Sequence, residues 1–305
     1  MKPLVSIILP TYNRADFLGR SIISVLNQQF ANFELIIVDD ASVDNSKEVI
    51  AVFDDQRIIY LKHERNLGGS AARNTGIRAA QGDFIAFQDS DDEWYPEKLE
   101  KQIKIMIETP PNVGVVYTGF LRVQGENKEY IPGPEIQIKE GNIFRELLKG
   151  NFVTTQAVLV KKECFQKAGM FDETLPRLQD WELFLRIAKF YEFCYIPEPL
   201  VKSFYTEGSI SSNPKALIEA FEIIMGKNIA DYKADQELYV KKLNWLFNHC
   251  RIENDIKKIR EYLIKLFQVY YRPGLILAII TTFLGIRFFN FYWDLMTRVQ
   301  GKKEA

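Results

Sequence analysis

The side chains best able to carry chemistry in this chain are carboxylates. Asp89, Asp91 and Asp92 lie in the segment DSDD, directly after the apolar run 83–88. Two carboxylates at the end of a strand can converge on one cation, and such oxygen ligands suit Mg²⁺ or Mn²⁺ together with substrate phosphates. The alternative is a solvated acidic turn that begins a helix at Asp92. An EF-hand loop is excluded, because Trp94 occupies the position that requires glycine.

Two further acidic sites follow other predicted elements. Asp39 and Asp40 end the apolar run 34–38, where they could accept hydrogen bonds from a ligand or cap a turn. Asp180 lies in the first turn of an amphipathic segment, 179–187, beside Trp181. It could serve as a general base shielded by the indole, or simply as an acid favoured at a helix N-terminus.

A glycine pair precedes the helix that the sequence predicts over 70–81. Gly68 and Gly69 would leave backbone N–H groups able to face an anion, and Arg73 could extend a cation toward a phosphate. The segment lacks the Gly-Lys-Ser/Thr ending of a nucleotide P-loop. A purely structural turn is therefore the alternative.

Composition excludes several classes of protein. The 305 residues are 47% hydrophobic and 26% charged, values typical of a globular protein. The 39 basic and 40 acidic side chains nearly cancel, which argues against a nucleic-acid binder. Only two histidines and three scattered cysteines are present, so neither a disulfide framework nor a Ser-His-Asp enzyme is expected. No secretory signal precedes Pro3, and we expect a reduced, cytoplasmic protein.

The elements that must position the carboxylates alternate in type. Helical patterns separate the first four apolar runs, which predicts an α/β fold with a mostly parallel sheet flanked by helices and ligands at the carboxyl ends of its strands. Prolines and glycines make 109–151 look like a boundary region. The predicted strands are 4–9, 34–38, 57–61, 83–88 and 153–160; the predicted helices are 17–26, 44–53, 70–81 and 180–190, with an almost entirely helical region from 215 onward.

Together these segments resemble the family 2 glycosyltransferases, which have the Rossmann-like GT-A fold. The resemblance covers about residues 3–210. It rests on the order and spacing of VSIILPTYNR (5–14), LIIVDDASVD (35–44), NLGGSAARNTGI (66–77), DFIAFQDSDD (83–92) and GMFDETLPRLQDWELFLRI (169–187).

The resemblance implies inverting transfer from a nucleotide-sugar, usually a UDP-sugar, to a glycan or lipid-linked glycan. Thr11 and Tyr12 match positions that line the base pocket, Asp40 matches the acceptor of the base N–H, and Arg73 lies near the nucleotide. Asp89 and Asp91 match the pair that holds the ribose and a divalent metal, Mn²⁺ or Mg²⁺, with Asp92 adjacent. Asp180 matches the general base of a Glu-Asp motif, although Gln179 replaces the glutamate here.

The resemblance also suggests how the chain is organised. We expect residues 1–108 to form the nucleotide-sugar-binding half and 109–212 the acceptor-binding half of one catalytic domain, followed by a helical region, 213–305. A nicotinamide dehydrogenase is excluded, because PTYNRADF stands where its glycine fingerprint should follow the first strand. A non-catalytic scaffold with a transferase fold at the membrane is the remaining alternative.

The C-terminal tail has a pattern that the family resemblance does not explain. Residues 274–286 are apolar or weakly polar but too few for a clean span, and Arg287 and an aromatic cluster, 288–293, follow. From 257 to 305 nine basic residues stand against three acidic ones, a net charge of +6. We expect 274–303 to lie on an anionic membrane surface, at the inner face of the cell membrane, as an interfacial helix or shallow hairpin. The alternative is a homodimer interface.

Overall fold

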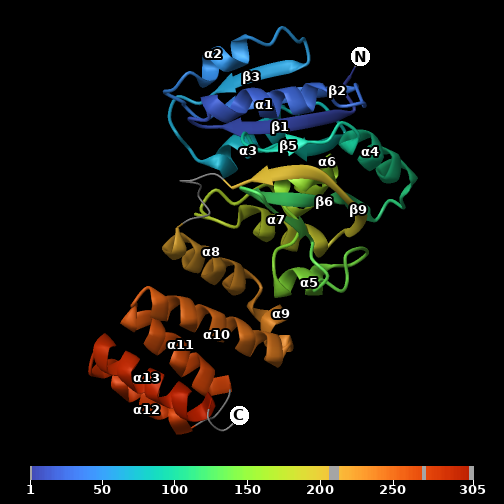
Figure 1. Ribbon diagram of the computed structural model, residues 1–305. Coiled ribbons are helices and arrows are strands. Elements are labelled where there is room, and N and C mark those ends of the chain that lie inside the picture. Colours follow the sequence, from blue (N-terminus) through green and yellow to red (C-terminus); the bar gives the residue numbers. More distant parts are fainter. Residues whose placement is uncertain (1, 206–212, 270–272, 302–305) are drawn as a thin grey trace. The chain divides into compact units, whose positions relative to one another are not determined.

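The computed structural model describes residues 2–205, 213–269 and 273–301 (Figure 1). The chain divides into two compact units, Met1–Ser209 and Ile210–Ala305. The first unit is built on one nine-stranded sheet with the strand order β3-β2-β1-β4-β8-β6-β9-β5, and β7 pairs with β6.

The first part of the sheet follows the alternation that the sequence predicts. Its elements are β1 (Val5–Thr11), α1 (Ala15–Leu26), β2 (Phe33–Asp39), α2 (Ser46–Ala51), β3 (Ile58–Lys62), α3 (Gly69–Ala79) and β4 (Phe84–Phe87). All pairings among these four strands are parallel. The predicted strand and helix positions are therefore confirmed to within a few residues, and the carboxyl ends of β1 and β2 meet at one edge.

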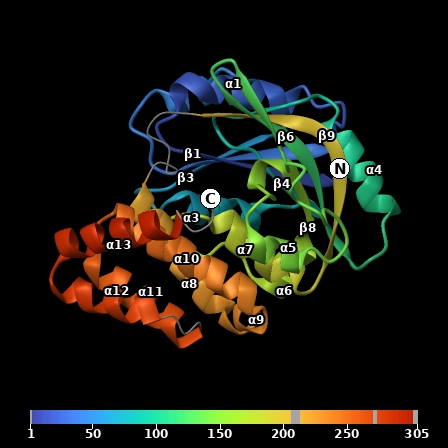
Figure 2. The same cartoon turned by 60° about the horizontal axis from the view of Figure 1, so that its bottom comes forward.

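Helices cover both faces of this parallel part. Ile7 and Leu9 of β1 share a core cluster with Leu18 of α1. Ile8, which points to the other face, packs so closely on Gly76 of α3 that an added Cβ there would lie 2.4 Å from its Cγ2. Figure 2 shows α1 and α3 on opposite sides of β1.

The rest of the sheet is mixed. It comprises β5 (Glu93–Trp94), α4 (Lys98–Glu108), β6 (Val113–Gln124), β7 (Asn127–Ile131), α5 (Phe144–Lys149), a 3₁₀ turn (Thr155–Ala157), β8 (Val158–Lys161), α6 (Lys162–Ala168), α7 (Gln179–Ala188) and β9 (Glu192–Phe204). Strand β8 runs antiparallel to both β4 and β6, whereas β6 and β9 are parallel. The predicted strand 153–160 therefore shortens at its start, where the 3₁₀ turn replaces it.

The interpretation of 109–151 as a boundary is wrong. The long strand β6 and its hairpin partner β7 occupy much of this segment, and β6 lies inside the sheet between β8 and β9. The apolar residues Val115, Val116 and Tyr117 are fully buried there. Pro110 and Pro111 precede the strand, so they mark its start rather than a break between domains.

The second unit is helical in its described residues. It contains α8 (Pro214–Lys227), α9 (Ile229–Ala234), α10 (Gln236–Ile252), α11 (Ile256–Val269), α12 (Pro273–Phe283) and α13 (Ile286–Gly301). Aromatic contacts hold it together, including Phe221 on Trp245 and Phe247 on Trp293, with ring centroids 4.5 and 4.6 Å apart. Gly285 has a φ of +101° and joins α12 to α13 in a hairpin. None of the helices described is long and apolar enough to cross a membrane.

Candidate active site

The loops after β1 and β2 bring the first group of predicted residues together. The backbone N–H of Asp40 donates to the carbonyl of Thr11 over 2.9 Å. Thr11 is buried, and Tyr12, which follows it, is 45% exposed. Asn13 and Ala41 adopt left-handed backbone, with φ of 51° and 65°. Non-glycine residues held in this region cost free energy and often mark functional loops.

Both carboxylate oxygens of Asp40 contact other groups of the protein. Its Oδ1 lies 2.7 Å from Nδ1 of His63 and accepts the N–H of Leu67 at 2.8 Å, while its Oδ2 accepts the N–H of Gly68 at 2.7 Å. Only 3% of Asp40 is exposed. Gly68 has a φ of +92°, a conformation that glycine tolerates best. Asp40 thus fastens the loop that leads into α3, and its contact with a nucleobase stays a prediction.

Replacing Asp40 tests both roles. Asp40→Ala is expected to weaken UDP binding and to lower the melting temperature, because Leu67 and Gly68 lose the acceptor of their N–H groups. Each such loss typically costs about 1–3 kcal/mol. Isothermal titration with UDP and thermal unfolding would measure the two effects.

His63→Ala is the matched control, because it disturbs the same network and leaves the carboxylate in place. We expect it to lower stability with less effect on UDP affinity. Unchanged UDP affinity in Asp40→Ala would contradict the predicted contact with the base.

The DSDD turn follows β4 and is held by α1. Arg20 donates from Nη2 to the carbonyl of Asp91 at 2.6 Å, and the hydroxyl of Ser21 donates to the carbonyl of Asp89 at 2.8 Å. Asp92 is only 2% exposed and accepts the N–H of Phe204 at 3.0 Å. Burial, with the neighbouring Asp89 and Asp91 carboxylates, raises the pKa of Asp92 well above its ordinary range.

The alternative of a solvated turn that begins a helix at Asp92 is therefore wrong. Strand β5 follows this residue directly, and α4 begins only at Lys98. Asp92 anchors the turn against β9, whereas Asp89 and Asp91 are only partly buried.

Helix α3 connects the separate parts of the site. Arg73 places Nη2 2.6 Å from Oδ1 of Asp89. Thr75 lies 3.0 Å from Nε2 of His63, which contacts Asp40. Asn74 donates to the carbonyl of Phe171 at 2.9 Å and accepts its N–H at 3.0 Å, which fixes the loop ahead of α7. One helix thus links the loop that carries Asp40, the DSDD turn and the segment that carries Asp180.

Asp180 lies in the first turn of α7, after Leu178, which has a left-handed φ of 61°. Its Oδ1 accepts the N–H of Trp181 at 2.8 Å, and its Oδ2 accepts Nδ2 of Asn151 at 3.0 Å. Burial raises the pKa of Asp180 above its ordinary value, although these two hydrogen bonds and the Arg73 charge oppose the rise.

The charges of Arg73 and Asp89 both act on the pKa of Asp180, in opposite directions. The structure therefore brings Asp180 within electrostatic reach of the Arg73–Asp89 pair. Thr11 and Tyr12 lie with Asp40 at a neighbouring part of the same edge, and α3 connects the two groups.

The chemistry of the available side chains decides whether a metal ion fits the site. Within the described residues, no three His, Cys, Asp or Glu side chains are grouped closely enough to hold a metal ion by themselves. Mg²⁺ and Mn²⁺ usually take one or two carboxylates and complete their shell with water and substrate phosphates. Asp89 and Asp91 fit that arrangement, because both carboxylates are oxygen donors and neither is fully buried.

Sequence reasoning missed Arg20, Ser21, Asn74 and Asn151. Asn74 lies inside the quoted motif 66–77, but nothing in its spacing predicts a bond to Phe171, 97 residues away. Arg20 and Ser21 show only the helical period of α1. Asn151 lies in the supposed boundary region and carried no signal.

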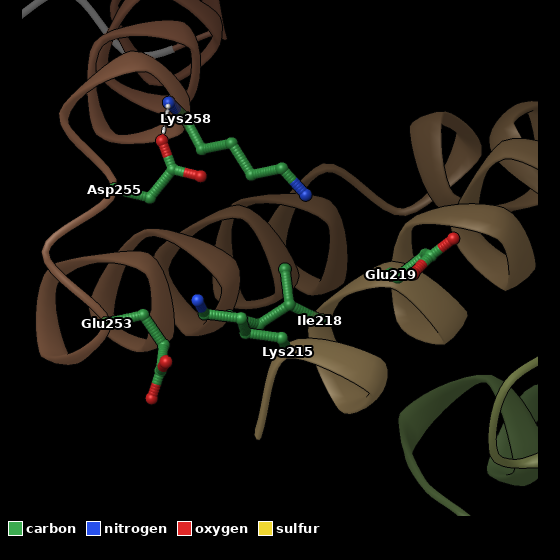
Figure 3. A pocket seen from close by; sticks show the side chains of 6 residues that line it. All are labelled: Lys215, Ile218, Glu219, Glu253, Asp255 and Lys258. Carbon is green, nitrogen blue, oxygen red and sulfur yellow. Dashed lines mark hydrogen bonds between the residues drawn. The ribbon is translucent and has the colours of Figure 1, made fainter. Parts of the chain in front are cut away.

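A hollow of about 390 Å³ lies in the second unit and contains none of the predicted site residues. Figure 3 shows charges of both signs around it, with Lys258 and Asp255 on one side and residues of α8 on the other. Its lining residues are Lys215, Ile218, Glu219, Glu253, Asp255 and Lys258. Its mixed charge points to no particular ligand.

The chain belongs to glycosyl transferase family 2. The model of that family matches residues 6–169, which include the DSDD turn and the Arg73–Asp89 pair. The predicted class of enzyme, a glycosyltransferase, and the GT-A fold are thereby confirmed.

Two relatives match most of the chain. The putative teichuronic acid biosynthesis glycosyltransferase TuaG of Bacillus subtilis is 30% identical over 264 residues, 84% of this chain and 98% of TuaG. The Escherichia coli UDP-Glc:alpha-D-GlcNAc-diphosphoundecaprenol beta-1,3-glucosyltransferase WfgD is 35% identical over 212 residues, 69% of this chain and 80% of WfgD. The chain spans only 30–35% of the length of longer Rickettsia relatives.

Solved structures share the fold. Staphylococcus aureus TarS 1–349 in complex with UDP-GlcNAc superposes with a TM-score of 0.70 and 18% identity, over 91% of this chain and 84% of that one. The Pyrobaculum calidifontis mannosyltransferase PcManGT with GDP-Man and Mn²⁺ gives 0.61 and 16%, over 97% and 84%. These two neighbours hold different nucleotides, so the fold alone does not select the donor.

Proposed function

We propose that this chain transfers a sugar with inversion from a UDP-sugar to a hydroxyl of a glycan or lipid-linked glycan, with Asp180 as general base. The observation that carries the proposal is that α3 joins the two parts of the site: Arg73 pairs with Asp89, and the adjacent Asn74 bonds to the backbone of Phe171 in the segment that leads to Asp180. A donor-side group and a partly buried carboxylate then share one site, as transfer between two bound substrates requires.

The chain's residues account for both ends of the reaction. The hydroxyl oxygen of the acceptor bonds to the anomeric carbon as the bond from that carbon to the diphosphate breaks. Asp180 takes the proton of the attacking hydroxyl. Burial raises the pKa of Asp180, which makes its ionised form a stronger base near neutral pH. Arg73 supplies a positive charge beside Asp89, where the resemblance places the nucleotide. Attack from the face opposite the diphosphate inverts the anomeric centre.

A divalent cation, Mn²⁺ or Mg²⁺, completes the proposed donor site. Asp89 and Asp91 would hold it with the diphosphate. When bound, such a cation neutralises the charge that develops on the leaving diphosphate. The Mn²⁺ in PcManGT supports this part of the proposal.

The donor nucleotide and the acceptor are proposed from the relatives. WfgD, the relative at 35% identity, is named for a UDP-sugar and a diphosphoundecaprenol-linked acceptor, and TarS binds UDP-GlcNAc. Thermal unfolding with Mn²⁺ and UDP-, GDP- or dTDP-sugars would test the donor. A ligand at a hundred times its dissociation constant should add about 2.7 kcal/mol. Tighter binding of GDP than of UDP would contradict the choice.

The second unit supports the proposed membrane contact. Apolar side chains between 40% and 71% exposed recur at helical spacing along α12 and α13, whereas Ala278 and Phe289 are buried. We call this surface the apolar stripe: Ile276, Leu277, Ile280, Phe283, Leu284, Phe288, Phe291 and Leu295. Arg260 lies over the ring of Phe283, 3.7 Å from its centroid, at the border of the stripe. Exposed apolar residues beside basic ones suit an anionic lipid surface.

Phe291→Glu is expected to reduce binding to vesicles of phosphatidylglycerol and phosphatidylcholine by about tenfold or more. The change removes an apolar contact worth roughly 1.5–3 kcal/mol when buried and adds a negative charge. Ile252→Glu, on an exposed isoleucine outside the stripe, is the matched control. Sedimentation with vesicles would measure both.

Truncation after Tyr271 should abolish vesicle binding altogether. If the full-length chain ignores anionic vesicles and changes from dimer to monomer on truncation, the stripe is an oligomer interface instead. Residues 302 and 303 of the predicted membrane segment lie outside the described residues.

A further inference from the structure

A short segment between α5 and the 3₁₀ turn places an amide against the proposed base. Phe152 and Val153 are buried and fix this segment in the core. Asn151, just before them, donates from Nδ2 to Oδ2 of Asp180 at 3.0 Å. The N–H of Trp181 donates to the other oxygen, so the two donors hold the carboxylate from both sides.

The carbonyl oxygen of the Asn151 side chain is in a different situation from its NH₂ group. Within the described part of the chain, its Oδ1 is buried and has no hydrogen-bond partner. A buried carbonyl without a donor destabilises a fold, so asparagine is an unfavourable residue here for packing alone. The amide orientation follows from its neighbour, because a carboxylate oxygen can accept the N–H of Asn151 but cannot donate to its carbonyl.

Other charged groups also act on Asp180. Arg73 projects from α3, Asp89 lies after β4, and Arg177 lies just before α7. Asn151 differs from these three because it is a neutral donor in direct contact with the carboxylate. It can therefore orient the base without adding a charge where the diphosphate is expected.

We propose that Asn151 is a positioning residue that orients the carboxylate of Asp180 for proton transfer from the acceptor. This inference rests on the proposed function, because it assigns Asn151 a task within that reaction. It has two consequences. Loss of the donor should make Asp180 harder to ionise, and it should lower turnover without weakening donor binding.

The first consequence can be measured without substrate. We would compare the melting temperature of the wild type with that of Asp180→Asn from pH 4 to 8. Ionised Asp180 is disfavoured in the folded state, so the wild type gains stability relative to Asp180→Asn as pH falls through the pKa of Asp180. The same pair is then compared in an Asn151→Leu background, where this transition should move up by about one pH unit or more. Asn151→Ala serves if Asn151→Leu does not fold.

Thr154→Val is the matched control. Thr154 lies in the same segment, and within the described residues its hydroxyl is also buried without a partner. The change keeps the side-chain shape and should leave the pH transition of Asp180 in place. A transition that stays put in Asn151→Leu, or moves equally in Thr154→Val, would overturn the positioning role.

Kinetics supply the second test. With UDP-glucose, Mn²⁺ and water as acceptor, Asn151→Leu should lower kcat at pH 7 at least tenfold with KM for the donor unchanged. An unchanged kcat, or a KM that rises as much as kcat falls, would overturn the role. If the wild type does not turn over any UDP-sugar, the proposed function fails, yet the melting experiment still decides whether Asn151 controls Asp180.

Discussion

Asp180→Asn is expected to lower the transfer rate by about 10²–10⁴-fold while UDP affinity stays within a factor of two or so of the wild type. Asparagine keeps the shape of the side chain but cannot take the proton of the acceptor hydroxyl. Turnover with a UDP-sugar and titration with UDP would measure the two quantities. Asp83→Asn, on an exposed carboxylate directly before β4, is the matched control and should be fully active.

The same variant should not be less stable at neutral pH. Burial raises the pKa of Asp180, so its ionised form destabilises the folded state above that pKa, and asparagine removes the penalty. For the same reason the wild-type rate should fall as pH is lowered through this pKa, which lies above 3.8. A loss of UDP affinity as large as the loss of turnover would instead place Asp180 in the nucleotide site.

Asp91→Asn should reduce metal-dependent transfer by two or more orders of magnitude and leave the fold intact. It removes one charged ligand from the proposed cation, whose stabilisation of the leaving diphosphate amounts to several kcal/mol, at about 1.4 kcal/mol per tenfold in rate. Rates across a Mn²⁺ titration would show the loss.

Asp89→Asn is the matched comparison. Asp89 also pairs with Arg73 at 2.6 Å, so its replacement should lower the melting temperature as well as the rate. Full activity of Asp91→Asn in EDTA would contradict the metal site.

The parallel part of the sheet could be predicted because its sequence pattern depends only on residues close together in the chain. Short apolar runs such as 34–38 end in carboxylates, and each is followed by a helical period. Strand β6 was missed because its partners are distant: Val116 pairs with Leu159 in β8 and with Cys194 in β9. The prolines beside it are a stronger local signal than its own apolar residues, but they mark the start of the strand rather than a break between domains.

The residue types of the site could be predicted, but their partners could not. The edge of the sheet follows from strand ends, and so Asp40, Asp89 and Asp91 lie on it as expected. The contacts of the Asp40 carboxylate with His63 and Gly68 join chain segments that pack together only in the folded state. The same is true of the contact between Asp180 and Asn151. Both facts change which variants are informative.

Proton NMR of UDP-α-glucose turnover tests metal-dependent inverting transfer most directly. Purified protein with Mg²⁺ and water as acceptor should release UDP and β-glucose first, ahead of mutarotation, and EDTA or Asp180→Asn should stop the release. Related UDP-sugars would be run in the same way, because the donor sugar is a proposal. Release of the α anomer, release that persists in EDTA, or no turnover of any UDP-sugar would contradict the account, the last in favour of a scaffold without catalysis.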